Sequence, residues 1–151
     1  MVTPSAPAAG ATPVRIRRAV AFGLNLPLAK PVLMAGTRLE HSGNLLVRLE
    51  SEDGLVGWGE ANAAPSHGGA TLPEMLQACE AILIPGLVGQ DARRLGGLSA
   101  SLATRLETGH SAAAAVDMAL HDLVGHHLGV PAHVLLGGLR RDTVEPLWLL
   151  G

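Results

Sequence analysis

Histidines gather in the last third of the sequence, where they raise the question of a metal site. The four are His121, His126, His127 and His133. Two histidines of a helix share one metal ion when they are three or four residues apart, because that spacing places both imidazoles on one face. His126 and His127 are adjacent, and His121 precedes them by five and six residues. His133 lies beyond Pro131. The nearby carboxylates of Asp117 and Asp122 are also badly spaced for a metal cage. The pattern favours separate histidines with local partners, and it predicts no metal ligand here.

Isolated residues elsewhere carry weaker chemical signals. Cys79 is the only cysteine and lies in an apolar helical pattern, so a packed thiol is expected rather than a nucleophile. His67, in the stretch PSHGG, could contact a ligand from a loop, although a lone loop histidine more often contacts none. Lys30 is the only lysine, so chemistry that needs two lysines cannot be complete within these residues. The sequence contains no phosphate-binding loop, dinucleotide fingerprint or nucleophile elbow.

Composition argues against several classes of partner. The chain has 11 basic and 13 acidic residues, a formal net charge of -2, two tryptophans, one phenylalanine and no tyrosine. Because there is no basic patch and little aromatic surface for stacking bases, neither a nucleic acid nor a membrane is expected as a partner. The opening residues lack the pattern of a signal peptide, and a single cysteine suits a reducing compartment, so a cytoplasmic location is expected. Residues 1–13 are expected to form a disordered tail.

Hydrophobic alternation predicts three strands before any helix. The first starts at Val14 and is expected to be half-buried, with one set of large apolar residues on one face and small or charged residues on the other. That apolar set is Val14, Ile16, Val20, Phe22 and Leu24. Residues 44–50 and 55–61 form the next two strands, and the turn at Asp53-Gly54 joins them in an antiparallel hairpin. Trp58, between two glycines, is expected to pack in the core.

Two connections are expected to be loops. Residues 25–43 are too many for a simple turn and contain Pro27, Pro31 and Gly36. Their apolar content argues against a solvated linker, so this loop is expected to close over something. The second loop, in the stretch NAAPSHGGA, leads from the third strand into a helix.

Three helical segments are expected after the strands. Their expected bounds are Thr71 to about Ile84, Asp91 to 107, and Ser111 to Gly129. Thr71 and Glu74 have the spacing of a capping box, and Pro85-Gly86 is expected to stop the first helix. Ser111 is the expected N-cap of the third helix, and Gly129 is its expected left-handed terminus. A three-stranded antiparallel meander followed by a helical bundle predicts an α+β fold.

Three separated blocks of sequence carry a family resemblance. They are IRRAVAFGLNLPLAKPV, NLLVRLESEDGLVGWGEA and AAAAVDMALHDLVGHHLGVPAHVLLGG. In this order they resemble the N-terminal capping domain of the enolase superfamily, in the mandelate racemase and muconate lactonizing enzyme branch. The stretch ALHDL and the proline-rich first loop are more similar to the muconate cycloisomerase subgroup. The resemblance implies a capping domain over residues 14–138. It implies that residues 139–151 are a linker and the first strand of a truncated modified TIM barrel.

The resemblance also implies an activity for the longer protein. Members of this superfamily abstract a proton α to a carboxylate, with Mg²⁺ stabilising the enediolate and a lysine or histidine as base. A cycloisomerase, racemase, epimerase or dehydratase is therefore expected, which makes it an isomerase or lyase. The resemblance places metal ligands and bases on barrel strands, so no catalytic residue is expected in this chain, and the 151 residues alone are expected to be inactive. The implied partners are a small carboxylate substrate, the chain's own C-terminal barrel domain and further copies in a homo-oligomer.

Substrate selection is assigned by the resemblance to two cap loops. They correspond to residues 26–37 and 61–68 of this chain. The residues expected to determine specificity are Leu28, Lys30, Val32, Met34, Asn62, Ser66 and His67. The apolar members favour a substrate with a hydrophobic portion. Lys30 could attract a second anionic group, although a solvated lysine is the simpler interpretation.

A second class of function stays open. The 151 residues could form a non-catalytic interaction or binding module derived from such a cap. The surface that a barrel would cover would then be an exposed apolar patch, which predicts aggregation or obligate association.

Overall fold

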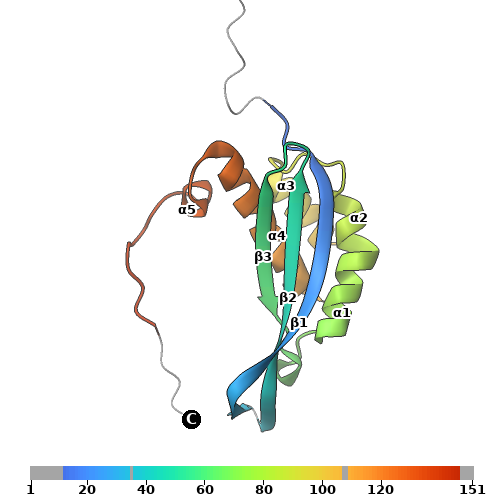
Figure 1. The fold of residues 1–151 in the computed structure, drawn as a ribbon, viewed down its shortest axis with the longest axis vertical. Coiled ribbons are helices and arrows are strands. Elements are labelled where there is room, and N and C mark those ends of the chain that lie inside the picture. Colours follow the sequence, from blue (N-terminus) through green and yellow to red (C-terminus); the bar gives the residue numbers. More distant parts are fainter. Residues whose placement is uncertain (1–11, 35, 107–108, 147–151) are drawn as a thin grey trace, which may run out of the picture.

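The computed structural model describes residues 12–34, 36–106 and 109–146 of the chain. Three strands come first: β1 (Ile16–Met34), β2 (Thr37–Ser51) and β3 (Val56–Asn62). The helical elements are η1 (Pro65–His67), α1 (Leu72–Ala78), the π-helical turn η2 (Cys79–Leu83), α2 (Ile84–Leu87), α3 (Leu95–Ala103), α4 (His110–Leu128) and α5 (Ala132–Leu135). The strands form one antiparallel sheet in the order β1-β2-β3, and α1, α2 and α4 pack along one side of it (Figure 1). The predicted α+β order, an antiparallel meander followed by helices, is confirmed.

The connection between β1 and β2 is a long paired hairpin rather than the loop predicted for residues 25–43. Pairing continues to the tip, where Val32 lies opposite Leu39 and Leu33 lies opposite Arg38. Among the described residues of this segment, the ladder is irregular only between Pro27 and Val32. Prolines cannot donate to a ladder but are tolerated in an edge strand, so the prolines interrupt the pairing without ending it. The hairpin twists and projects beyond the helices (Figure 1).

A β-bulge near the start of β1 reverses the predicted distribution of its side chains. Ile16 lies opposite Ser51 and Arg18 opposite Glu50, so β1 uses two residue steps where β2 uses one. One extra residue moves every later side chain to the other face. Val14 and Ile16 are therefore buried, whereas Phe22 is 42% exposed. The residues that line up with the buried Leu49, Val47 and Leu45 of β2 are Ala19, Ala21 and Gly23.

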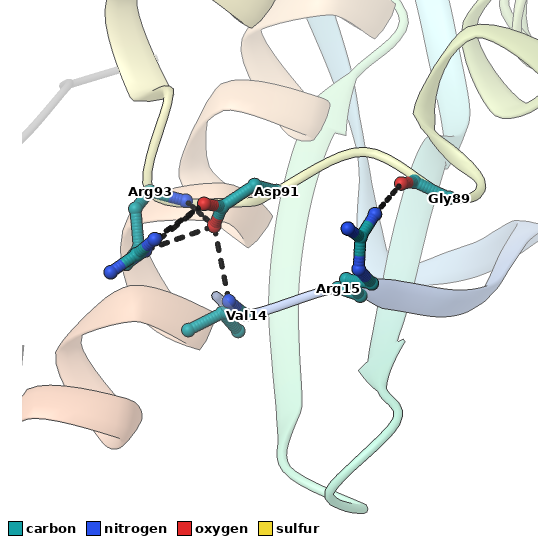
Figure 2. Close-up of polar contacts among 5 residues, drawn as sticks. All are labelled: Val14, Arg15, Gly89, Asp91 and Arg93. Carbon is teal, nitrogen blue, oxygen red and sulfur yellow. Dashed lines mark hydrogen bonds and ion pairs between the residues drawn. The ribbon is translucent and has the colours of Figure 1, made fainter. Parts of the chain in front are cut away.

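Asp91 fixes the segment before β1 to the segment between α2 and α3 (Figure 2). Its carboxylate accepts the main-chain N–H of Val14 at 3.0 Å and the guanidinium of Arg93 at 2.7 Å. Arg15 donates to the carbonyl of Gly89 at 3.3 Å in the same region. The Arg93 guanidinium, helped by the main-chain N–H groups of Arg93 and Val14, lowers the pKa of Asp91 to about 2. Asp91 therefore links segments 77 residues apart instead of starting a helix, and α3 begins at Leu95.

The helical run from Leu72 has the predicted start and a later end. The capping box is confirmed, because Glu74 accepts the N–H of Thr71 at 2.7 Å and Thr71 accepts the N–H of Glu74. Helical geometry continues past Pro85 to Leu87 through the π-helical turn. In that turn the N–H of Ile84 bonds to the carbonyl of Cys79, five residues back. The wider turn makes room for a proline ring that would crowd a regular α-helix.

Helix α4 lies unusually close to β3, because β3 presents glycines to it. A Cβ on Gly57 would lie 2.3 Å from the carbonyl oxygen of Ala119, and one on Gly59 would lie 1.9 Å from that of Ala115. No side chain fits there, so glycine is required at both positions. Trp58, between them, points to the opposite face and is 45% exposed, so its predicted place in the core is wrong.

The ends of α4 match the prediction in part. Gly129 adopts the left-handed conformation at the C-terminal end, with φ 65°, as expected. Ser111 is not the N-cap, because the helix begins at His110 directly after Gly109. Gly109 has φ 78°, and its carbonyl accepts the N–H of Ala112 at 2.8 Å, so a glycine turn starts the helix without a side-chain cap.

One hydrophobic core fills the space between the sheet and the helices. Its largest fully buried side chains include Leu45 and Leu49 of β2, Met75 and Leu83 beside them, and Leu120 of α4. The single thiol is also part of this core, since Cys79 is fully buried. The predicted packed thiol is confirmed, and burial, with a smaller contribution from Glu80, raises its pKa to about 11.

The predicted terminal segments fall partly outside the described residues. Residues 1–11 of the expected tail lie outside them, as do residues 147–151 of the expected barrel strand. Residues 139–146 are described and form neither helix nor strand. The division of the chain at residues 13 and 138 stays a prediction.

Candidate functional site: a hollow under the hairpin

A hollow of about 500 Å³ lies where the β1–β2 hairpin extends beyond the helices. Leu28, Val32 and Leu39 of the hairpin form an apolar wall. The opposite wall comes from η1 and the start of α1, with Ser66, His67, Thr71 and Leu72 among its residues. Two segments far apart in the sequence thus enclose one space at the end of the sheet.

The residues predicted to determine specificity are distributed around this hollow. Five of the seven line it: Leu28, Val32, Asn62, Ser66 and His67. Lys30 is exposed on the hairpin and is not among the lining residues. Met34 belongs to the paired part of β1, opposite Thr37. Their role in specificity stays a prediction, although the structure brings most of them to one place.

Sequence reasoning missed His41 and Asn25, which also line the hollow. His41 lies opposite Pro27 in the ladder, within the segment predicted as a loop. His41 is separated from Leu45 and Val47 by even numbers of residues in β2. Its side chain therefore lies on the same face of the sheet, which the helices cover. Extending the predicted alternation of this strand from Leu45 back by four residues would have placed His41 on the buried face.

Asn62 organises the polar side of the hollow. Its side-chain amide donates to Asn44 Oδ1 at 2.8 Å, Ser42 Oγ at 2.9 Å and the carbonyl of Gly43 at 3.2 Å. Asn44 is 7% exposed, so its carboxamide needs such partners. The donors of Asn62 are therefore engaged with β2, and this residue positions the start of the loop that follows β3.

That loop is held mainly by its own main chain. The N–H of Gly69 bonds to the carbonyl of Ala64 at 3.0 Å, and Gly68 adopts φ 74°. Ser66 Oγ lies 3.1 Å from Nδ1 of His67, so the two side chains at the tip of η1 act as a pair. Because the backbone is fixed from within, their exposed polar atoms are available to a ligand.

The lining of the hollow has no formally charged side chain, and its titratable groups are two imidazoles. None of its lining residues is an aspartate, glutamate, lysine or arginine. On the hairpin, Arg38 and Glu40 pair with each other at 3.1 Å and are exposed. The lining therefore suits a molecule that is apolar on one side and forms hydrogen bonds on the other. It holds no arrangement of nucleophile, base and orienting group.

The histidines near the end of α4 bind separate partners. Nδ1 of His121 donates to the carbonyl of Asp117 at 2.9 Å, within the helix. Nδ1 of His126 donates to the carbonyl of Val56 in β3 at 2.8 Å. Within residues 12–34, 36–106 and 109–146, no three histidine, cysteine or carboxylate side chains gather in a way that could hold a metal ion.

Ser99, Asp117 and His121 lie together but are not a catalytic triad. The hydroxyl of Ser99 donates to a carboxylate oxygen of Asp117, and the imidazole of His121 approaches the other oxygen at 3.4 Å. In a triad the histidine stands between the serine and the carboxylate. Here the carboxylate stands in the middle, so no base faces the hydroxyl, and the group joins α3 to α4.

Comparison with known proteins agrees with this architecture. Residues 16–137 match the family model described as "Mandelate racemase / muconate lactonizing enzyme, N-terminal domain". Muconate cycloisomerase 1 of Rhodococcus opacus is 35% identical over 130 residues, which are 85% of this chain and 35% of that protein. The L-Lys-D/L-Arg epimerase of Methylococcus capsulatus is 40% identical over 117 residues, which are 75% of this chain and 32% of that protein.

Solved structures show the same relationship. The muconate lactonizing enzyme of Pseudomonas fluorescens, in complex with muconolactone, superposes with a TM-score of 0.80 at 26% identity, over 87% of this chain and 36% of that one. The L-Ala-D/L-Glu epimerase of Bacillus subtilis, with substrate bound, gives a TM-score of 0.74 at 29% identity, over 81% of this chain and 34% of that one.

The chain spans about a third of the length of the curated relatives it matches. Among the described helices, none has both the length and the apolar character that crossing a membrane requires. With the matched region covering residues 16–137, the chain belongs to the mandelate racemase/muconate lactonizing enzyme family and contains its N-terminal domain.

Proposed function

We propose that this chain is the substrate-capping part of an enzyme that removes a proton α to a carboxylate. The observation that carries the proposal is the hollow between the hairpin and η1, in a chain whose relatives include cycloisomerases and epimerases. Epimerisation of an amino acid breaks the C–H bond of the carbon atom next to its carboxylate, and muconate is itself a dicarboxylate. The cap would cover such a substrate while a second domain performs the chemistry.

The cap contributes binding and exclusion of water. The apolar wall of Leu28, Val32 and Leu39 would contact a hydrophobic part of the substrate, and the imidazoles of His41 and His67 would offer hydrogen bonds. Excluding water strengthens the electrostatic interactions around the charge that develops when the proton leaves. The paired hairpin suits this role better than an irregular loop, because a ladder holds its wall in place.

We propose that the base and the metal ligands of the reaction lie outside the described residues. Mg²⁺ would stabilise the negative charge of the deprotonated substrate. The described residues do not fit such an ion, since they bring no three suitable ligands together. The lining of the hollow also lacks a carboxylate. We therefore derive no metal-dependent step from this chain and expect the 151 residues alone to be inactive.

A barrel domain of the same protein is the proposed main partner of the cap. Exposed apolar side chains continue from α5 into the segment that follows it, with Leu136, Leu139 and Val144 between 62% and 78% exposed. Burying such residues against a neighbouring domain would remove them from water. The proposed small-molecule partner is a carboxylate whose distal part is at least partly apolar, and the proposed location is the cytoplasm.

The test uses the polypeptide as its source produces it. Its intact mass is compared first with the 15.5 kDa of this chain, and a much larger mass is expected. Exchange of the α-proton for deuterium is then followed by NMR in D₂O, with Mg²⁺, for a panel of muconolactones, dipeptides and N-acylated amino acids. Exchange of at least one member is expected, and no exchange from any member would contradict the proposal.

A matched pair of variants distinguishes an effect of the hollow on substrate choice from a general loss of activity. Leu28→Ala removes part of the wall of the hollow, whereas Leu24→Ala removes an apolar side chain from the other face of the same strand. Leu28→Ala is expected to change kcat/KM by different factors for different substrates, by about 10-fold for one with a large apolar portion. Leu24→Ala is expected to leave the order of substrates unchanged. Equal effects of the two variants would contradict the assignment of the hollow.

A further inference from the structure

The floor of the hollow is made by the paired strands β1 and β2, and it becomes polar where the cover of α1 ends. A Cβ on Gly23 would lie 3.4 Å from the side chain of Leu72 in α1, and a Cβ on Gly43 would lie 3.5 Å from it. The next residues on this face toward the hairpin tip are Asn25 and His41, and both line the hollow. Two polar side chains therefore stand between the apolar core and the apolar wall of the hairpin.

The ladder holds these two side chains beside each other. Asn25 lies opposite Gly43, and His41 lies opposite Pro27, within the regular part of the pairing. The two are therefore diagonal neighbours on one face, and their Cβ atoms are expected to be about 7 Å apart. Gly43 adds no side chain beside them. One polar group of a ligand can therefore reach both the carboxamide and the imidazole.

Other polar groups of the lining are already engaged within the protein. The amide of Asn62 donates to β2, and the hydroxyl of Thr71 belongs to the capping box of α1. The two side chains at the tip of η1 contact each other. Within the part of the chain that the structure describes, no hydrogen bond or ion pair engages the side chain of Asn25 or His41. Their donors and acceptors are therefore available to a ligand.

The charge of the lining limits what Asn25 and His41 can recognise. No aspartate, glutamate, lysine or arginine lines the hollow. A carboxylate or ammonium group of a substrate that leaves water there meets no opposite charge from the cap, which costs free energy. A carboxamide is different, because it has donors and an acceptor and no charge. The amide of Asn25 and a neutral imidazole each offer a donor and an acceptor in return.

We propose that Asn25 and His41 are specificity-determining residues that bind an uncharged hydrogen-bonding group in the part of the substrate remote from its reacting carbon. This inference rests on the proposed function and deepens it, because it states the class of substrate: a carboxylate whose far end is polar but neutral. Lys30, which is exposed on the hairpin and outside the lining, takes no part in this recognition.

The experiment compares probes that differ only in one terminal group. N-butanoyl-, N-succinamoyl-, N-succinyl- and N-β-alanyl-L-phenylalanine end their acyl chains in a methyl, a carboxamide, a carboxylate and an ammonium group. The N-acetyl derivatives of L-norvaline, L-glutamine, L-glutamate and L-2,4-diaminobutyrate carry the same four groups on the side chain. The Kd of each probe for the longer polypeptide is measured by calorimetric titration with Mg²⁺ present. In one set the carboxamide is expected to bind at least about 10-fold more tightly than the two charged probes.

Two groups of variants assign this preference to the two residues. His41→Leu is expected to reduce the preference for carboxamide over methyl about 10-fold, whereas His41→Gln keeps a donor and an acceptor and should retain most of it. Asn25→Asp is nearly isosteric and is expected to shift the preference from carboxamide toward ammonium at least about 10-fold. Leu24→Asp places the same charge on the other face of the strand and should leave the order of probes unchanged. Circular dichroism verifies that each variant is folded.

The readout is the ratio of Kd values between probes, because a merely structural role would change the binding of all four by one factor. Ratios that neither His41→Leu nor Asn25→Asp changes would overturn the proposal. So would a charged probe that binds as tightly as the carboxamide in both sets, or the absence of binding by all eight probes. The proposed function is judged separately, by exchange of the α-proton. Probes that bind in the expected order without any exchange would contradict the reaction and still support this recognition.

Discussion

The main-chain N–H of Trp58 donates to Oδ2 of Asp122 at 2.8 Å, across the free edge of the sheet. β3 is an outer strand of the described sheet, so its outward N–H and carbonyl groups have no strand to pair with. The imidazole of His126, four residues further along α4, binds the carbonyl of Val56 on the same edge. One face of α4 thus supplies both a donor and an acceptor to the open edge. This arrangement is possible only because Gly57 and Gly59 let the helix approach so closely.

Replacing Asp122 by alanine is expected to lower the free energy of unfolding by about 1 to 2 kcal/mol. A hydrogen bond to a charged acceptor contributes about 1.5 to 3 kcal/mol, and partial exposure of this carboxylate reduces it. Asp122→Asn should cost less, because the amide oxygen still accepts. Urea unfolding followed by circular dichroism measures both. The exposed Glu52→Ala is the control, and an equal effect of Asp122→Ala and Glu52→Ala would contradict the edge-capping role.

Replacing Gly59 by alanine is expected to destabilise the chain by about 2 to 3 kcal/mol or prevent folding, since overpacking costs of this size are usual. The new Cβ would lie 1.9 Å from the carbonyl oxygen of Ala115, so α4 must move away from β3. Gly96→Ala in α3 is the matched control, because no atom lies within 4 Å of its Cβ. That variant should be stabilised by about 0.5 to 1 kcal/mol through helix propensity. Thermal unfolding distinguishes the two, and similar changes at both sites would contradict the close approach.

The ion pair of Asp91 is expected to make stability fall in acid. Its pKa is about 2 in the folded chain and ordinarily 3.8, so its contribution is complete above pH 3.8 and is lost as the pH falls toward 2. Because this side chain reaches solvent in part, we expect a contribution of the order of 1 kcal/mol. Asp91→Asn should remove that contribution, so the variant loses less stability than the parent chain between about pH 5 and pH 2.5. Parallel pH profiles for the two proteins would count against the role of Asp91.

Cys79 is expected to resist alkylation in the folded chain. Its thiol is fully buried and its pKa is raised to about 11, so very little thiolate exists at pH 8 and reagents cannot reach it. Iodoacetamide labelling followed by mass spectrometry should show almost no reaction in buffer and complete reaction in concentrated urea. Rapid labelling without urea, while circular dichroism remains that of the folded chain, would show that this thiol is more accessible than its burial indicates.

Local chemistry of the sequence predicted much of the fold. The capping box of Thr71 and Glu74, the turn at Asp53-Gly54 and the left-handed Gly129 each depend on residues a few positions apart. Such features need no knowledge of distant neighbours, so the pattern of residues was sufficient. The family resemblance rests on the same kind of information, and the matched family model agrees with it over residues 16–137.

Predictions that depended on distant partners failed or were missing. The bulge at the start of β1 exchanges its two faces, and no local pattern shows where one strand uses an extra residue against another. Asp91 looked like a helix start, but Val14 and Arg93 bind its carboxylate. Trp58 looked like a core residue, whereas the glycines on either side of it are the positions that face α4.

The features of the candidate site also fall into those that depend on the local sequence and those that depend on distant contacts. In the sequence, prolines and glycines marked residues 25–43 as a separate segment, and the family resemblance singled out residues 26–37 and 61–68 as the segments expected to select the substrate. Only the tertiary structure decided that Leu28 and His67 border one hollow, that His41 belongs to it, and that the amide of Asn62 is used to hold Asn44 and Ser42. The physical reason is that side chains of β1, β2 and η1 meet through strand register and helix packing, which long-range contacts set and short-range propensities do not.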